Sequence, residues 1–161
     1  MRIGDTHRFA VELGNTLTTD DRLRQVDVWA AGQWLTCVDN VVFVPQFVAS
    51  VQADLRRLRS GFPPPLPFPA VSPQDTHVLL DDYEKRCPFT FMGWGPTADN
   101  VCANLFRDGD SLVLTCHFWS LGVGTEVFVA TITADELASI LEQLLAALGF
   151  EDHSPRFAER R

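Results

Sequence analysis

Residues 101–148 read VCANLFRDGDSLVLTCHFWSLGVGTEVFVATITADELASILEQLLAAL and decide the second half of the fold. Asp108, Gly109 and Asp110 stand between two apolar runs, where an Asp-Gly pair is a strong signal for a tight β-hairpin. A third strand-like run follows over residues 126–132. The stretch therefore predicts a three-stranded antiparallel meander that leads into a helix.

The helix at the end of this stretch has clear start and stop signals. Thr133 and Glu136 have the spacing of a capping box, and Gly149 stands where a helix would end. Between them, leucine and isoleucine residues recur at spacings of three and four, so one face of the helix is apolar. We expect a helix over residues 134–148 that buries this face.

The first half of the chain predicts further strands and a second helix. Residues 8–13 alternate between polar and apolar side chains, and residues 24–38 contain two strand-like runs around Ala31-Gly32. Residues 45–59 begin with a proline and carry apolar side chains at helical spacing, which predicts an amphipathic helix. Together the two halves predict an α+β fold, a largely antiparallel sheet of about six strands with two amphipathic helices packed on one face.

Length and composition indicate a single globular domain. The 161 residues are 46% hydrophobic and 21% charged, which suits one core and excludes general disorder. No apolar run approaches the length of a membrane-spanning helix, and the first ten residues lack the apolar segment of a secretory signal. We expect one domain over residues 1–161, located in the cytoplasm and not in a membrane.

Six of the ten prolines fall in residues 60–73, SGFPPPLPFPAVSP. Such a segment favours extended polyproline II and cannot join the interior of a sheet. It is either a docking segment for a proline-recognising module or a stiff connector. We favour the connector, because Phe62, Leu66 and Phe68 would be wasted in a free linker. At the other end, residues 151–161 are polar and predict a frayed tail.

The net charge of −8 is unevenly distributed along the chain. Residues 108–155 contain eight acidic residues and neither lysine nor arginine. The sequence has no basic footprint of the kind that binds phosphates, so we expect no nucleic-acid partner. The acidic half suits either simple solubility or a positively charged protein partner.

The sequence carries no recognisable metal or catalytic motif. Its four cysteines form no Cys-x-x-Cys pair, and Cys116 and His117 would point to opposite faces of a strand. We therefore expect no metal, no cofactor and no catalytic residue, and we do not expect an enzyme. His117 is either a general base or, as we favour, a half-buried histidine held by hydrogen bonds.

Residues 75–96 have the least regular pattern in the chain. Asp81, Asp82 and Glu84 form a solvated acidic turn, an acidic docking surface or a cation site, although they lack EF-hand spacing. Trp94 stands between two glycines, where a large aromatic ring either fills the core or anchors a partner. We select these four residues as partner-binding candidates, and the acids of residues 108–152 as the next candidate face should Trp94 be buried.

Two short stretches resemble bacterial polymorphic-toxin immunity proteins, particularly immunity family forty-two. They are Ile3-Gly4-Asp5 followed by Phe9-Ala10-Val11-Glu12 and, more generally, the closing run VFVATITADELASILEQLLAAL at 127–148. The resemblance implies a cytoplasmic protein that binds and neutralises a cognate toxin domain with fixed stoichiometry. A basic, nuclease-type toxin would suit the acidic half. The alternative is a small-molecule-binding domain, or an enzyme without a recognisable motif, with a pocket between the sheet and residues 75–100.

Overall fold

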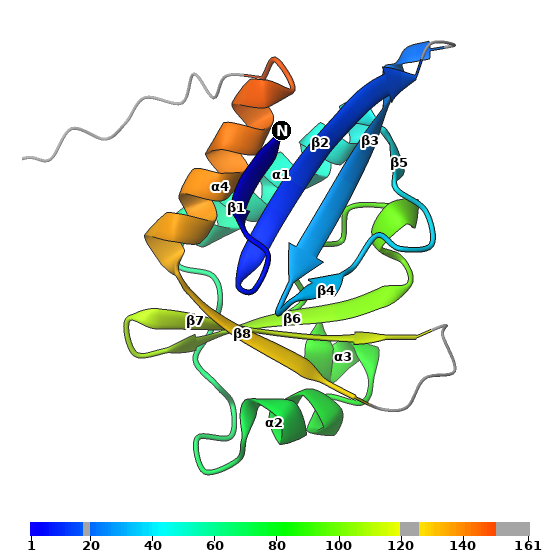
Figure 1. Cartoon of the computed structure of the whole chain (residues 1–161). Coiled ribbons are helices and arrows are strands. Elements are labelled where there is room, and N and C mark those ends of the chain that lie inside the picture. Colours follow the sequence, from blue (N-terminus) through cyan, green and yellow to red (C-terminus); the bar gives the residue numbers. More distant parts are fainter. Residues whose placement is uncertain (18–19, 120–125, 151–161) are drawn as a thin grey trace, which may run out of the picture.

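The computed structural model describes residues 1–17, 20–119 and 126–150, and within them the chain forms two antiparallel sheets and four α-helices (Figure 1). The expected α+β class and the antiparallel pairing are confirmed. The strands do not form one sheet of about six, however, but divide into a five-stranded and a three-stranded sheet. A helix and the proline-rich segment separate the two sets of strands in sequence, and each set pairs locally.

The first sheet consists of β1 (Arg2–Asp5), β2 (Phe9–Leu17), β3 (Asp20–Ala30), β4 (Gln33–Trp34) and β5 (Val41–Phe43). Its order is β1-β2-β3-β4, and β5 pairs with the other end of β3. The expected hairpin turns at Ala31 and Gly32, whose φ values of 51° and 76° match the left-handed geometry of tight hairpin turns. Its second arm is shorter than expected, because only two residues of 33–38 are in a strand.

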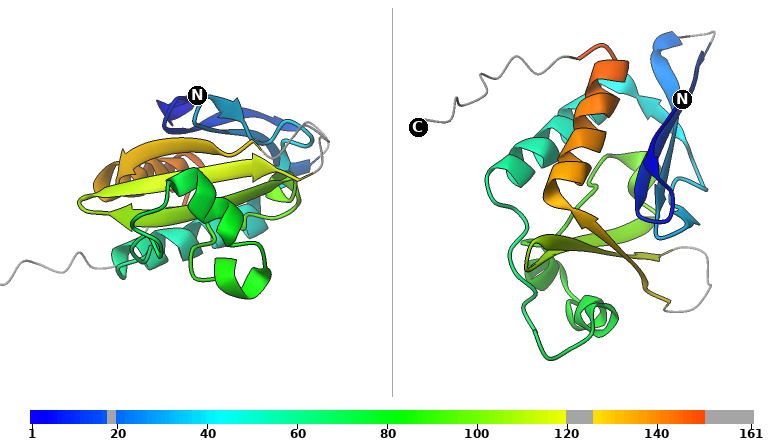
Figure 2. Two further views of the ribbon diagram at one scale, coloured as in Figure 1. Left: turned by 90° about the horizontal axis from the view of Figure 1, so that it is seen from below. Right: turned by 60° about the vertical axis from the view of Figure 1, so that its left-hand side comes forward.

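Two long helices lie side by side on one face of the five-stranded sheet (Figures 1 and 2). They are α1 (Val44–Arg59) and α4 (Ala134–Ala147), within one residue of the predicted bounds. The Glu136 N–H donates to the Thr133 hydroxyl at 3.1 Å, as the capping motif predicts. In the described part of the chain, every helix is too short or too polar to cross a bilayer.

The three-stranded sheet closes one end of this layer. It is the predicted meander, with β6 (Val101–Asp108), β7 (Ser111–Phe118) and β8 (Phe128–Thr133) in sequence order. Asp108 pairs with Ser111 across the Asp-Gly turn, and this register extends to Val101 opposite Phe118. The short helices α2 (Pro73–Leu79) and α3 (Tyr83–Arg86), which the sequence analysis missed, lie below this sheet (Figure 2). A 3-10 turn, η1 (Pro96–Ala98), precedes β6.

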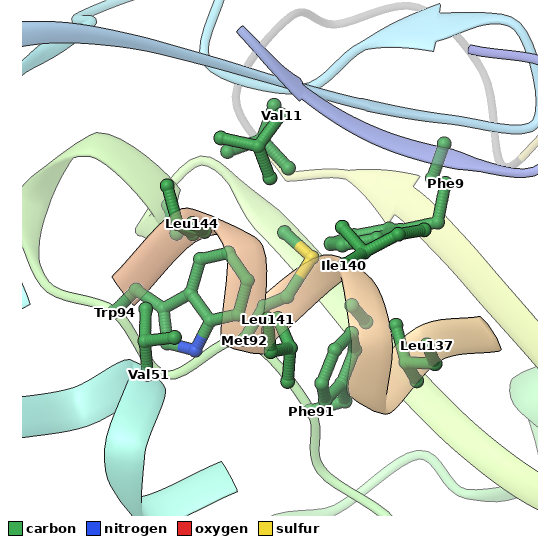
Figure 3. Packing of buried hydrophobic residues seen from close by; sticks show 14 of the residues in the cluster. Phe9, Val11, Val51, Phe91, Met92, Trp94, Leu137, Ile140, Leu141 and Leu144 are labelled. Carbon is green, nitrogen blue, oxygen red and sulfur yellow. The ribbon is translucent and has the colours of Figure 1, made fainter. Parts of the chain in front are cut away.

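The main core lies between the five-stranded sheet, the two long helices and the upper face of the three-stranded sheet (Figure 3). The apolar stripe of α4 fills its centre, and Leu141 and Leu144 are fully buried there. A second, smaller cluster of Leu80, Phe89 and Phe106 lies on the opposite face of the three-stranded sheet, with Leu66 packed against it. The sheet is therefore covered on both faces.

The proline-rich connector runs along β6. The Leu66 N–H donates to the Arg107 carbonyl at 3.1 Å, and the Arg107 N–H donates to the Pro64 carbonyl at 2.9 Å. Phe62 packs against the main core and Leu66 against the smaller cluster, as expected for a connector that docks on its own domain. Phe68 differs from the expectation, because 39% of it is exposed. The predicted tail, 151–161, lies outside the described residues.

Candidate functional site

Trp94 belongs to the main core, which corrects its expected place on a contact surface. Its ring is 3% exposed and stands edge-on to Phe9, with 6.1 Å between centroids (Figure 3). The indole N–H donates to the buried Asp54 carboxylate at 2.9 Å. Met92 and Gly95 have φ values of 65° and 95°, and the turn they form inserts the ring. The glycine-rich context of Trp94 is thus the turn that buries it.

The other three predicted contact residues are exposed at the start of α3. Asp82 caps this helix, accepting a hydrogen bond from the Lys85 N–H at 2.8 Å. The Lys85 ammonium also contacts Asp81 at 2.7 Å and Asp82 at 3.2 Å. Hydrogen bonds from Lys85 hold the pKa of each aspartate below its usual range, so both are ionised at neutral pH. Asp81, Asp82 and Glu84 therefore form a charged, solvated turn.

Large apolar side chains accompany these acids at the molecular surface. Tyr83 of α3 is 72% exposed, Val78 and Leu79 of α2 are 57% and 49% exposed, and Trp119 after β7 is 52% exposed. We call these four residues, together with Asp81, Asp82 and Glu84, the α2–α3 face. Exposed aromatic and apolar groups bordered by charges are typical of protein contact surfaces.

A pocket of about 200 Å³ opens beside this face, between α2 and the three-stranded sheet. Its position matches the one that the small-molecule alternative required. Its lining combines two imidazoles, a carboxylate, a guanidinium and apolar groups, with contributions from His77, Val78, Asp81, Arg86, His117 and Trp119. The Arg86 guanidinium lies over the Trp119 ring, 5.0 Å from its centroid. The pocket is smaller than the roughly 300–1,000 Å³ typical of drug-sized ligands.

Three side chains with metal-binding atoms lie close together here, and two of them, His77 and His117, line this pocket. Nε2 of His77 lies 2.7 Å from Nδ1 of His117, and one nitrogen of each ring and the Cys102 sulfur all lie within 4.8 Å of one another. Cys102 and His117 are direct partners across the β6–β7 hairpin, so their side chains share a face. The His77 side chain reaches them from α2. We call these three residues the His-Cys cluster.

Buried polar groups fix the His77 ring. Its Nδ1 lies 2.7 Å from the Thr115 hydroxyl and 3.2 Å from the Asn104 amide nitrogen. Thr115 and Asn104 are both fully buried, and they are partners across the same hairpin. The second ring nitrogen, Nε2, is thereby directed toward His117. Partners of this kind orient histidines that act as ligands.

Burial sets the protonation of the His-Cys cluster. It lowers the pKa of His77 to about 4, aided by the neighbouring His117 and Arg86, and it also lowers the pKa of His117. It raises the pKa of the Cys102 thiol. At neutral pH the two imidazoles are therefore uncharged and the thiol is protonated. A protonated, buried thiol is a poor nucleophile, and neutral imidazoles are good ligands.

His117 was a candidate from its position in a strand-like run, whereas neither His77 nor Cys102 was a candidate from the sequence. One signal was available for the cysteine, because a two-residue turn after Asp108 places residue 102 opposite residue 117. No comparable signal existed for His77, since the apolar pattern around it did not reveal α2. The excluded Cys116–His117 pair remains excluded, because Cys116 faces the main core.

Comparisons with known proteins identify a fold and no sequence family. No family model matches the chain, and no curated protein matches it in sequence. Among solved structures, the crystal structure of CdiI from Burkholderia dolosa AUO158 is similar, with a TM-score of 0.67 and 14% sequence identity. The likeness covers 91% of this chain and 99% of that chain. This chain therefore has the same fold as CdiI.

Proposed function

We propose that the protein is a cytoplasmic immunity protein that binds a cognate bacterial toxin domain and neutralises it by stoichiometric binding. The fold shared with CdiI, an immunity protein of contact-dependent inhibition, carries this proposal because it extends over 91% of the chain. The sequence supports it as well, because residues 3–5, 9–12 and 127–148 resemble immunity proteins. Such an inhibitor requires a rigid surface complementary to its partner and no active site.

The α2–α3 face is the proposed contact surface. Trp119 and Tyr83 take the anchoring role once assigned to Trp94, because their rings are about half exposed or more while that of Trp94 is buried. Asp81, Asp82 and Glu84 form a charged rim beside them. A basic toxin surface would be drawn toward this rim, and aromatic anchors would then slow its release.

The acids of residues 108–152 form a weaker candidate for the same role. Glu136 contacts Arg8 at 2.6 Å and Glu142 contacts Arg59 at 2.7 Å, so each charge is paired, as those of Asp81 and Asp82 are by Lys85. What distinguishes the two sets is the apolar side chains beside them. Asp108, Asp110 and Asp135 are exposed at the opposite end of the three-stranded sheet. None of the large, exposed apolar side chains of the described residues lies beside these three acids in sequence. They therefore serve as a matched control.

The test measures binding of the full chain to the toxin domain encoded beside its gene. Trp119→Ala should raise the dissociation rate and weaken binding by about 2 kcal/mol or more, as expected for an aromatic anchor. Neutralising Asp81, Asp82 and Glu84 as amides should lower the association rate and flatten its salt dependence. Amides retain the helix cap at Asp82, so folding should be preserved.

The control variant carries amides at Asp108, Asp110 and Asp135, and it changes the net charge by the same amount. If the control slows association as much as the variant on the α2–α3 face, long-range charge explains the effect and this face is not the contact surface. If the toxin domain neither binds the protein nor is neutralised by it when both are expressed in one cell, the immunity function itself is wrong.

A further inference from the structure

We propose that the His-Cys cluster binds one divalent transition-metal ion, with Zn²⁺ as the preferred ion, beneath α2. Imidazole nitrogen and cysteine sulfur are the donor types that Zn²⁺ favours, and three protein ligands leave a fourth coordination position open. The three donors already lie within 4.8 Å of one another. The proposal rests on the geometry of the cluster and not on the proposed function, although Asp81, Val78 and Trp119 of the α2–α3 face line the same pocket.

The absence of a zinc motif in the sequence does not argue against this site. Sequence templates describe ligands that are close together along the chain, whereas His77, Cys102 and His117 come from α2, β6 and β7. The β6–β7 register joins two of the ligands, and the packing of α2 on β7 adds the third. The expectation of no metal followed from the ligand spacing and from the opposite faces of Cys116 and His117, and neither ground concerns the pair Cys102 and His117.

The pocket suits an ion better than an organic ligand. Its volume of about 200 Å³ is small, and His77 and His117 line it. Cys102 is buried next to His117, its partner across the β6–β7 hairpin. The open side leads past Asp81 and Trp119 to solvent. An ion held by the cluster would thus have protein ligands behind it and a water molecule in the fourth position, on the pocket side.

Binding requires the two ligand nitrogens to move apart. Tetrahedral Zn²⁺ with Zn–N distances of about 2.0–2.1 Å separates two ligand nitrogens by about 3.3 Å. Nε2 of His77 and Nδ1 of His117 are 2.7 Å apart and share a hydrogen bond in the described structure. The ion replaces this bond and moves the nitrogens apart by a fraction of an ångström. With Nε2 on the metal, His77 carries its proton on Nδ1 and donates it to Thr115. A protonated Nδ1 cannot also accept from the Asn104 amide nitrogen, so this tautomer requires that amide to turn its unpaired oxygen toward Nδ1 instead.

The balance of charge is also acceptable. The Cys102 thiol loses its proton to solvent when it binds the ion, and each imidazole remains neutral. The thiolate offsets one of the two positive charges of the ion, while the Asp81 carboxylate that lines the same pocket is already paired with Lys85. Arg86 lines the same pocket and opposes a cation, but its guanidinium stacks on Trp119 and can extend toward solvent. The bound ion would link α2 to the three-stranded sheet and stabilise the packing of α2 against that sheet.

The experiment adds Co²⁺ and then Zn²⁺ to the metal-free, untagged full chain. A bound Co²⁺ ion should give a thiolate-to-cobalt charge-transfer band that saturates at one equivalent and disappears when Zn²⁺ displaces it. Zn²⁺ should also raise the thermal unfolding midpoint, because it binds only the folded chain tightly. Thr115→Val, which removes a positioning partner of His77, should weaken Zn²⁺ binding by about 10–100-fold.

Matched variants assign the ligands. Cys102→Ser should abolish the charge-transfer band, while Cys87→Ser, at an exposed cysteine outside the cluster, should leave it intact. His117→Gln should weaken binding, and His7→Gln should not. If the unmodified chain shows no thiolate–cobalt band, or if the band survives in Cys102→Ser, the proposal is overturned. If a variant fails to fold, the Co²⁺ titration of the unmodified chain still tests the proposal.

Discussion

The two faces of the three-stranded sheet use the same strands for different chemistry. Successive side chains of β6 and β7 alternate between the faces. The upper face contributes only apolar residues to the main core, namely Ala103, Leu105, Leu112, Leu114, Cys116 and Ile132. The lower face, covered by α2 and α3, buries the polar Asn104 and Thr115 together with Cys102 and the apolar Phe106, and holds His117 at the edge of a pocket.

The difference between these faces separates packing from specific recognition. An apolar face requires side chains of suitable volume, and several residue types satisfy that requirement. A buried polar face requires a partner for each donor and acceptor, because an unpaired polar atom is costly. Thr115 and Asn104 both contact Nδ1 of His77, and the Asn104 side-chain oxygen has no partner among the described residues, so we expect these three positions to tolerate fewer residue types than the apolar face.

The largest expected effect is a loss of stability in the main core, on the apolar side of the three-stranded sheet. Trp94→Ala should lower the free energy of unfolding by about 3–5 kcal/mol, because it empties a large volume in the main core. Trp119→Ala, on the pocket side, should cost less than about 1 kcal/mol, because half of that ring is already exposed. Urea denaturation of the two variants measures both values. Equal losses would show that the pocket-side tryptophan is structural as well.

A smaller effect is expected on the polar side. Thr115→Val keeps the branched shape and removes the hydroxyl that lies 2.7 Å from Nδ1 of His77. The loss should be about 1 kcal/mol of unfolding free energy, which is the net value of one buried hydrogen bond. Thr131→Val, at an exposed position on the same face of the sheet, is the control and should change stability by less than about 0.5 kcal/mol. A neutral Thr115→Val would mean that the polar side, too, is specified only by volume.

The smallest effect sets the scale for surface contacts. Arg59 and Glu142 join α1 to α4 at 2.7 Å, and their side chains are 42% and 44% exposed. Glu142→Gln should cost less than about 0.5 kcal/mol, because solvent screens an exposed ion pair. The difference should shrink further in high salt. Denaturation at two salt concentrations checks this, and a loss as large as that of Thr115→Val would contradict it.

The long helices and the meander were predictable because their signals are local. A capping motif, a proline in the first turn and apolar spacing fixed α1 and α4 within one residue, and an Asp-Gly pair fixed the β6–β7 hairpin. The division into two sheets was not predictable in this way. It depends on which strands pair with one another before and after the proline-rich segment. The residue pattern within a single strand does not specify its pairing partner.

The candidate site was harder to predict for the same reason. The acids near α3 are visible in sequence because charge indicates exposure, and they are exposed. Trp94 was misplaced because its burial depends on the backbone turn at Met92 and Gly95, which brings the ring to Asp54. The His-Cys cluster joins residues from separate elements, so only the pairing register offered a partial clue.

The turn between β6 and β7 has a consequence for how relatives of this chain could be recognised. Cys102 and His117 are the same number of residues away from the paired Asp108 and Ser111, one before the turn and one after it. A change of register by one residue would exchange the two faces of the strand and direct the imidazole into the main core. A cysteine and a histidine placed symmetrically about a two-residue β-turn are therefore a search pattern for the His-Cys cluster. The pattern leaves the position of the second histidine open.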